Sequence, residues 1–124
     1  MVAGAGFFIE GTGSNPIFTN CTISDNAAAF GGALYIMIQA RPTFNDTIFN
    51  NNTAQTEGGA LNIATGAAPS FTNCTVAHNR VTDPFSGGGG ALISDPLTAP
   101  VFTNTHFSNN TALASLGRDL SGAP

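Results

Sequence analysis

A Gly-Gly-Ala-Leu tetrad repeats along the chain, and its spacing limits the folds that the chain can adopt. The tetrad occurs at Gly31–Leu34, Gly58–Leu61 and Gly89–Leu92, and degenerate copies begin at Gly4 and Gly117. The first glycines are therefore 27, 27, 31 and 28 residues apart. A period in this range is typical of proteins built from stacked repeats, in which each repeat buries its apolar face against the next.

Two further blocks keep fixed distances from the tetrad. A Pro-x-Phe block carries Phe18, Phe44, Phe71 and Phe102, and another block ends in Asn26, Asn52, Asn79 and Asn110. The proline and this asparagine are 10 residues apart in all four copies, whereas the distance from the asparagine to the next glycine pair varies from 5 to 10 residues. Such variation is expected where only surface loops accept insertions. Each repeat is thus a rigid frame plus one variable connection.

Alternating residues within each repeat predict short β-strands. Leu34 and Ile36 flank Tyr35, a period of two residues that the next copy repeats. Gly, Asn and Pro interrupt the chain too often for a useful helix. The predicted fold class is all-β: a single-stranded parallel β-helix (β-solenoid) of about four coils of about 27 residues, with three short strands per coil. We expect it to be right-handed, because crossovers between parallel strands almost always are.

Residue parity places a sharp bend between the second and third strands. Phe18 and Ile23 are five residues apart, so on one straight strand they would face opposite sides. Both positions are apolar in all four repeats, however, and both should face the core. The chain must therefore bend between them. Asn and Asp tolerate the left-handed backbone that such a corner needs, which predicts corners at Asn20, Asp46, Asn73 and Asn104.

Stacked coils place equivalent residues about 4.8 Å apart, so like residues form columns. The predicted interior columns are Phe7/Leu34/Leu61/Leu92, Ile9/Ile36/Ile63/Ser94, Phe18/Phe44/Phe71/Phe102 and Ile23/Phe49/Val76/Phe107. The predicted outward column of the first strand is Phe8/Tyr35/Asn62/Ile93, and we expect Asn62→Asp to have little effect. Asn26, Asn52, Asn79 and Asn110 should form a side-chain amide ladder that satisfies backbone groups at the turns.

Cys21 and Cys74 fall in one column, two coils apart, with Thr47 between them. Twice the interstrand spacing exceeds the limit of about 7 Å between Cα atoms for a disulfide. We therefore expect two free, buried thiols that act as small core residues.

Composition bounds the domain organisation and the partners. The chain has 124 residues and a net charge of −4 with only three basic residues, all arginine, so it cannot neutralise nucleic-acid phosphates or favour an anionic membrane. No apolar run approaches the roughly 20 residues of a membrane helix. We expect residues 1–124 to form one β-helix domain, a fragment of a longer array, because solenoids need polar caps and none is evident.

The paired motifs resemble the repeats of the polymorphic outer membrane proteins of chlamydiae, in which Gly-Gly-Ala precedes Ile, Leu or Val and accompanies Phe-x-x-Asn. Phe49–Asn52 and Phe107–Asn110 match the second motif, while Asn26 and Asn79 keep only its asparagine. The resemblance covers most of the chain. It implies a right-handed parallel β-helix in the passenger of an autotransporter-like adhesin that is secreted or exposed at the cell surface, associated with the outer membrane.

The predicted function is accordingly a non-enzymatic module, a rigid stalk or a binding scaffold. Its expected partners are a surface ligand, either a host protein or a glycan, and neighbouring β-helix coils of a parent chain. The candidate binding loop is the long connection of residues 80–88, which combines Arg80, Asp83 and Phe85 with glycines. The alternative for this loop is a neutral change of length, since loops lengthen at little cost.

A fragment of a carbohydrate-active, pectate-lyase-like β-helix enzyme is the alternative function. Such catalysis needs clustered acids. The outward column of the first strand holds none, and the acids at Asp25, Asp46, Glu57, Asp83, Asp95 and Asp119 fall in different columns. The catalytic acids would have to lie outside this sequence. His78 shares a column with Asp25, Asn51 and Asn109, and His106 shares one with Thr22, Ile48 and Thr75. A metal site needs several converging ligands, so we interpret each as a lone surface imidazole and predict no catalytic residue, no metal site and no cofactor.

An ice-binding solenoid is the third option. It rests on threonines at Thr19, Thr72, Thr103, Thr22 and Thr75. Asn45, Ile48 and His106 interrupt these columns, and threonine favours β-strands in any case.

Overall fold

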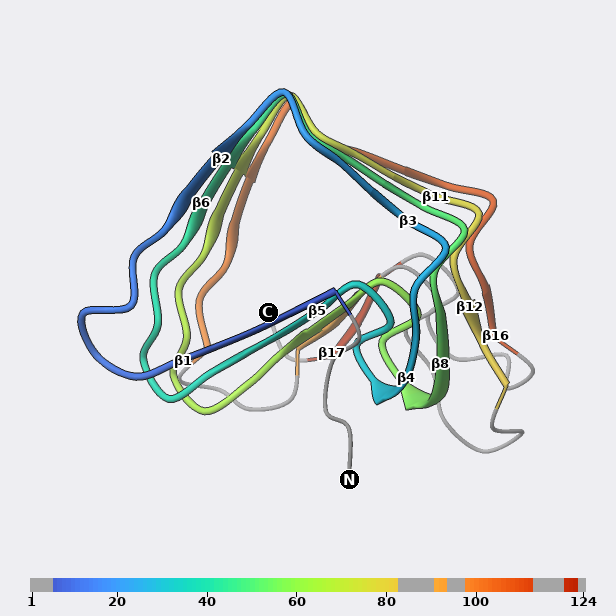
Figure 1. The fold of residues 1–124 in the computed structure, drawn as a ribbon, viewed down its shortest axis with the longest axis horizontal. Helices are drawn as coiled ribbons and strands as arrows, with labels where there is room; N and C mark the ends of the chain where they lie inside the picture. Colours follow the sequence, from blue (N-terminus) through green and yellow to red (C-terminus); the bar gives the residue numbers. More distant parts are fainter. Residues whose placement is uncertain (1–5, 83–90, 94–97, 113–119, 123–124) are drawn as a thin grey trace.

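The fold is a parallel β-solenoid built from four sheets (Figure 1). The computed structural model describes residues 6–82, 91–93, 98–112 and 120–122. Within these ranges the chain forms seventeen strands and every strand pairing is parallel. The all-β, parallel fold class is therefore confirmed.

Each sheet collects equivalent strands from successive coils. Sheet A contains β1 (Phe7–Glu10), β5 (Leu34–Met37), β9 (Leu61–Ile63), β13 (Ala91–Ile93) and β17 (Leu120–Gly122). Sheet B contains β2 (Ile17–Thr19), β6 (Thr43–Asn45), β10 (Ser70–Thr72) and β14 (Val101–Thr103). Sheet C contains β3 (Thr22–Ser24), β7 (Ile48–Asn50), β11 (Thr75–Ala77) and β15 (His106–Ser108). Sheet D contains β4 (Ala27–Phe30), β8 (Thr53–Glu57), β12 (Arg80–Val81) and β16 (Thr111–Ala112).

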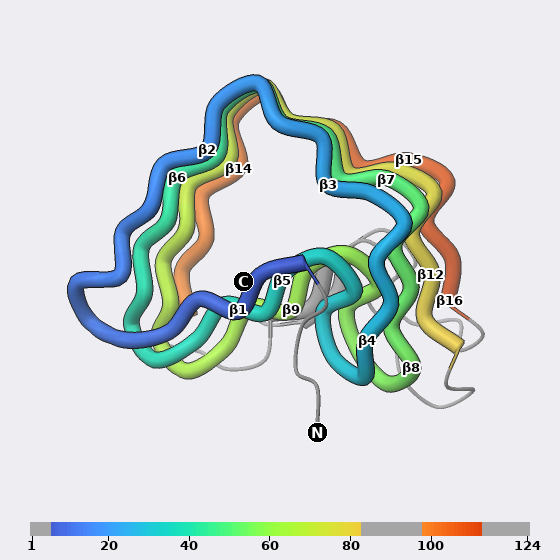
Figure 2. Tube along the Cα trace, viewed as in Figure 1, coloured from blue at the N-terminus to red at the C-terminus, as the bar shows by residue number. Residues whose placement is uncertain are grey.

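Each coil contributes one strand to every sheet, and successive coils lie one behind another with nearly the same outline (Figure 2). The expected number of about four coils is confirmed, but the prediction of three strands per coil missed the strand in sheet D. That strand begins directly after the ladder asparagine, in the segment whose variable length we attributed to a connection. Its inward residues are small, Ala28 and Ala54 among them, so the apolar pattern is weak there.

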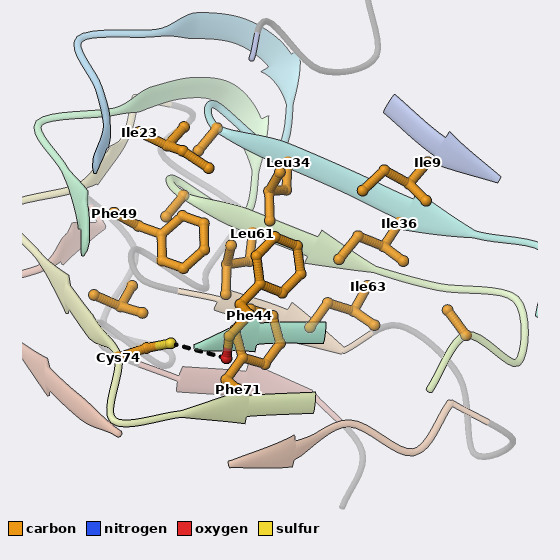
Figure 3. Close-up of a cluster of buried hydrophobic side chains, with 14 of the residues drawn as sticks. Ile9, Ile23, Leu34, Ile36, Phe44, Phe49, Leu61, Ile63, Phe71 and Cys74 are labelled. Carbon is orange, nitrogen blue, oxygen red and sulfur yellow. Dashed lines mark hydrogen bonds between the residues drawn. The ribbon is translucent and has the colours of Figure 1, made fainter. Parts of the chain in front are cut away.

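Stacked side chains fill the interior in the predicted columns (Figure 3). The rings of Phe18, Phe44, Phe71 and Phe102 form one continuous stack, with centroids 4.9, 4.9 and 5.0 Å apart. Phe49 meets the rings of Phe44 and Phe71 edge-on. Phe44, Phe49 and Phe71 are fully buried, so the aromatic columns are confirmed as the core.

The first coil is less well covered than the prediction assumed. Phe7 pairs with Leu34 in the predicted register, yet 42% of its surface is exposed because β1 is the terminal strand of sheet A. Cys21 is only half-buried for the same reason, at the edge of its column. The predicted burial of these two side chains is therefore wrong, although their predicted columns are correct.

The register of the fourth coil in sheet A differs from the prediction by one residue. Ala91 pairs with Leu61, Leu92 with Asn62 and Ile93 with Ile63. The tetrad alignment placed Leu92 beside Leu61, and it placed Ile93 in the outward column. A slip of one residue exchanges the two faces of a strand, so register follows the best apolar match. Here the observed register sets Ile93 beside Ile63, where the alignment would have set Ser94, which lies outside the described residues.

The corners between sheets B and C are left-handed, as predicted. Asn20, Asp46, Asn73 and Asn104 have φ values of 54°, 52°, 55° and 47°. A second, unpredicted set of left-handed corners separates sheets C and D, at Asp25, Asn51, His78 and Asn109. Short polar side chains tolerate this conformation, which explains why Asn and Asp fill seven of these eight corners.

Close backbone packing explains the glycine pair of the tetrad. The first glycine, Gly31 or Gly58, has a φ of 59° or 62° and starts the turn into sheet A. The second has no room for a side chain, because a Cβ at Gly32 would collide with the carbonyl oxygen of Gly59. One glycine thus supplies the turn, and the other lets successive coils touch.

The predicted asparagine ladder is present and joins every coil to the next. Oδ1 of Asn52 accepts hydrogen bonds from the backbone N–H and from Nδ2 of Asn26, at 3.1 and 3.0 Å. Nδ2 of Asn52 donates to Oδ1 of Asn79 and to the carbonyl oxygen of Ile23, both at 3.0 Å. Asn79 repeats the arrangement toward Asn110. The buried amides are therefore fully satisfied along the stack.

We expect Asn79→Ala to lower the free energy of unfolding by at least about 3 kcal/mol. The substitution would remove the hydrogen-bond partner that Asn79 provides to the backbone N–H and Nδ2 of Asn52 and to the carbonyl oxygen of Phe49. Each buried polar group left without its partner costs about 1–3 kcal/mol. Urea denaturation measures the change. The matched control is Asn15→Ala at an exposed position, which should shift stability by less than about 0.5 kcal/mol. Equal effects at both positions would contradict a stabilising ladder.

Candidate functional site

The predicted binding loop is described only at its start. Arg80 opens β12 and is exposed, on the strand that pairs with β8 and β16. Asp83 and Phe85 lie outside the described residues. The grouping of these three residues therefore stays a prediction.

Acidic and imidazole side chains are scattered over the part of the chain that the structure describes. Asp25 and Asp46 sit at corners on opposite ends of sheet C, and both are exposed. His78 occupies a corner and His106 begins β15. In the described ranges, no three His, Cys, Asp or Glu side chains come together as metal ligands would.

The threonine columns do not share one surface. Thr19 and Thr72 lie in sheet B, whereas Thr22 and Thr75 lie in sheet C. The sharp corner between these sheets turns the two columns to different faces (Figure 1). Within sheet C, an exposed Ile48 separates the threonines. The flat array that the ice-binding option needs is therefore not formed.

Aromatic rings of sheet A meet one ring from the end of sheet D: Phe8 and Tyr35 lie on β1 and β5, and Phe30 is the last residue of β4. The ring of Tyr35 lies 5.5 Å from that of Phe8 and 6.1 Å from that of Phe30, tilted by 49° and 44°. We call Phe8, Phe30 and Tyr35 the outer aromatic surface. Phe8 is 49% exposed, and the other two rings are partly buried. Leu34 and Ile36, on either side of Tyr35, are fully buried, so the central ring stands on a rigid strand.

Two carboxylates flank the outer aromatic surface. Glu10 is outward-facing on β1, two residues beyond Phe8, and is exposed. Glu57 on β8 pairs in register with Phe30 and is partly exposed. Residues paired across parallel strands are immediate neighbours, and alternate residues of one strand lie on one face about 7 Å apart. The rings thus carry a negatively charged rim.

Sequence reasoning missed this surface for a definite reason. Phe8 and Tyr35 were placed correctly in the outward column, but Phe30 was assigned to the variable connection. Its approach to Tyr35 depends on how the chain turns from β4 into β5, and its partner in the next coil is Glu57, so no aromatic column marks the position. The available signal was two aromatic residues in adjacent rungs of an outward column, where a solvated strand normally carries polar residues.

Asn62, in the same outward column, is buried, contrary to the prediction. Only 2% of its surface is exposed. It pairs with Tyr35 on one side and with Leu92 on the other, and a Cβ at Gly31 or Gly58 would lie 3.2 or 3.1 Å from its backbone nitrogen. The glycine turns therefore cover it. Its Oδ1 is buried and has no hydrogen-bond partner among the residues that the structure describes.

We expect Asn62→Asp to destabilise the fold at neutral pH by about 3 kcal/mol or more, because an unpaired buried carboxylate is costly. Burial raises the pKa of such a carboxyl, so stability should be near normal at acidic pH and should fall as the pH rises through that raised pKa. Asn62→Leu, which removes the unpaired oxygen, should match or exceed the natural protein. Thermal melting across pH tests both, and a tolerant Asn62→Asp would show that the position is solvated.

The cysteine and threonine side chains of one column hydrogen-bond to the backbone at the corners between sheets B and C. The thiol of Cys74 donates to the carbonyl oxygens of Thr72 and Phe44, both at 3.4 Å. Figure 3 shows the bond to Phe44. Thr47 and Thr105 donate to the equivalent carbonyls of their own coils. Both cysteines are free, as predicted. Burial raises the pKa of the Cys74 thiol above its ordinary value, outweighing the opposing effect of the Thr47 and Thr72 backbone.

This raised pKa predicts a loss of stability at alkaline pH. The contribution of Cys74 is fully present below the ordinary thiol pKa and is lost as the pH rises through the folded-state pKa. Cys74→Ala should remove that part of the alkaline decline, as seen by melting temperature against pH. Thiol titration gives an independent check: the half-buried Cys21 should react rapidly in the native protein, whereas Cys74 should react at the rate of unfolding. Equal reaction rates would contradict this assignment.

No helix in the described ranges is both long enough and apolar enough to cross a membrane. Residues 1–76 match the family described as the right-handed β-helix region. The match covers more than half of the chain and includes the first two tetrads and the ladder residues Asn26 and Asn52. Comparisons with curated proteins and with solved structures returned no significant match.

Proposed function

Because the chain belongs to the right-handed β-helix family, we propose that it is a non-enzymatic module of a cell-surface or secreted protein, a rigid stalk or an adhesin-passenger-like scaffold. The family match carries the fold and its handedness. The finer assignment draws on the resemblance of the Gly-Gly-Ala-Leu and Phe-x-x-Asn motifs to the repeats of chlamydial polymorphic outer membrane proteins.

The observation that carries the proposal is the self-contained coil-to-coil stacking. The buried amides of Asn52 and Asn79 use their hydrogen-bonding capacity on neighbouring coils, and the aromatic columns are continuous. Such a stack extends along one axis with the same cross-section, and each coil contacts only the coils on either side of it. This is the mechanical property that a stalk needs, and it leaves the exterior free to carry binding residues. That these coils belong to a longer array stays a prediction.

The arrangement of side chains on the exterior favours a binding role over a catalytic role. The described acids are spread over separate corners and strands, whereas the outer aromatic surface collects three rings in one place. Exposed apolar clusters with a polar rim are typical of interaction sites. A scaffold that binds a surface ligand needs such a patch and needs no convergent acids.

Antibodies raised against the folded chain test the location. We expect them to label intact cells of the native source, and external protease to remove the label. The control is an antibody against a protein of the cell interior, which should label only permeabilised cells. Labelling of the chain that required permeabilisation and was absent from the culture medium would contradict the proposal.

A further inference from the structure

Three features of the outer aromatic surface indicate the kind of ligand that it binds. Its rings are partly exposed, its central ring lies between the fully buried Leu34 and Ile36 of β5, and its rim carries Glu10 and Glu57. In the described part of the chain, neither carboxylate has a basic partner: Arg41 lies at the entry to sheet B and Arg80 in sheet D, and no ion pair joins them to these residues. The rim charge is therefore available to a ligand.

Charge complementarity selects a cationic ligand. Ring faces attract a cation through their quadrupole, by about 0.5–1 kcal/mol at exposed sites and more when water is excluded. Carboxylates beside the rings add to this attraction. The whole chain carries −4, so the long-range field also favours a positively charged partner. A neutral ligand would draw on the rings alone.

The shape of the site favours a segment of a protein over a small ammonium compound. Phe8 is half-exposed, and the rings are tilted by 44–49°, so the described residues form an open surface and not a closed cage. An aromatic centre with a charged, solvated rim is the usual anatomy of a protein interface hot spot. The Tyr35 hydroxyl, which no described residue hydrogen-bonds, adds a polar group at the centre.

We propose that the outer aromatic surface binds a Lys- or Arg-containing segment of a partner protein. An ammonium or guanidinium group rests against Tyr35, and Glu10 and Glu57 contact further basic side chains. This inference rests on the proposed binding role and names the partner by its chemistry. It also assigns the site to residues of β1, β4, β5 and β8, a different set from the predicted loop of residues 80–88.

The test titrates the purified chain with a nine-residue peptide of alternating Arg and Gly, at low and at physiological salt. Tyr35→Leu, which keeps an apolar side chain and removes the ring, should weaken binding about two- to fivefold. Tyr35→Phe is the matched control and should bind nearly as the natural protein does. Glu10→Gln should weaken binding and reduce its salt dependence. Asp46→Asn removes an equal charge at a distant corner and should do neither.

Several outcomes would overturn the assignment. These are equal effects of Glu10→Gln and Asp46→Asn, unchanged binding by Tyr35→Leu, or preference for a neutral oligosaccharide or tetramethylammonium over the basic peptide. Circular dichroism of each variant establishes that the coil is intact. The two experiments test separate claims. If antibodies label the cell surface but the chain does not bind the basic peptide, only the ligand assignment is contradicted. If the chain binds the peptide but is found inside the cell, only the proposed location is contradicted.

Discussion

Each coil is fixed to the next by a buried asparagine that serves two coils at once. Oδ1 of Asn79 accepts both the backbone N–H and the side-chain N–H of Asn52, while Nδ2 of Asn79 reaches back to the carbonyl oxygen of Phe49. Three hydrogen bonds thus define the position of one turn relative to its neighbour. Because a buried amide without partners is costly, only coils of nearly equal outline can follow one another.

Because all coils share one outline, the constraints on interior residues differ from those on exterior residues. Inside, the ring stack from Phe18 to Phe102 and the Cys/Thr column at the corners admit little variation. Outside, residues change from coil to coil without disturbing the stack. Tyr35 and Asn62 occupy one outward column, yet one carries part of an exposed aromatic surface and the other is covered by glycine turns. Function in such a fold is therefore a local property of particular rungs.

Much of the fold could be read from periodicity, and little of the candidate site could. Column membership of Phe44 or Asn52 follows from counting, since stacking repeats the same position in every coil. The proximity of Phe30 to Tyr35 depends on how the chain turns from β4 into β5. The partner of Phe30 in the next coil is Glu57, so no column of aromatic residues marks this position in the sequence.

The sequence by itself determined the repeat, the parallel strands, the left-handed corners at residues such as Asn20, the amide ladder and the free thiols, because each of these recurs and the recurrences must coincide in space. Tertiary structure alone decided the fourth strand of each coil, the fourth-coil register that sets Ile93 beside Ile63, and the burial of Asn62. These depend on where variable connections pack, and packing energy is summed over neighbours that are distant in the chain. The same packing brings the rings of Phe8 and Tyr35 on sheet A together with that of Phe30 at the end of β4.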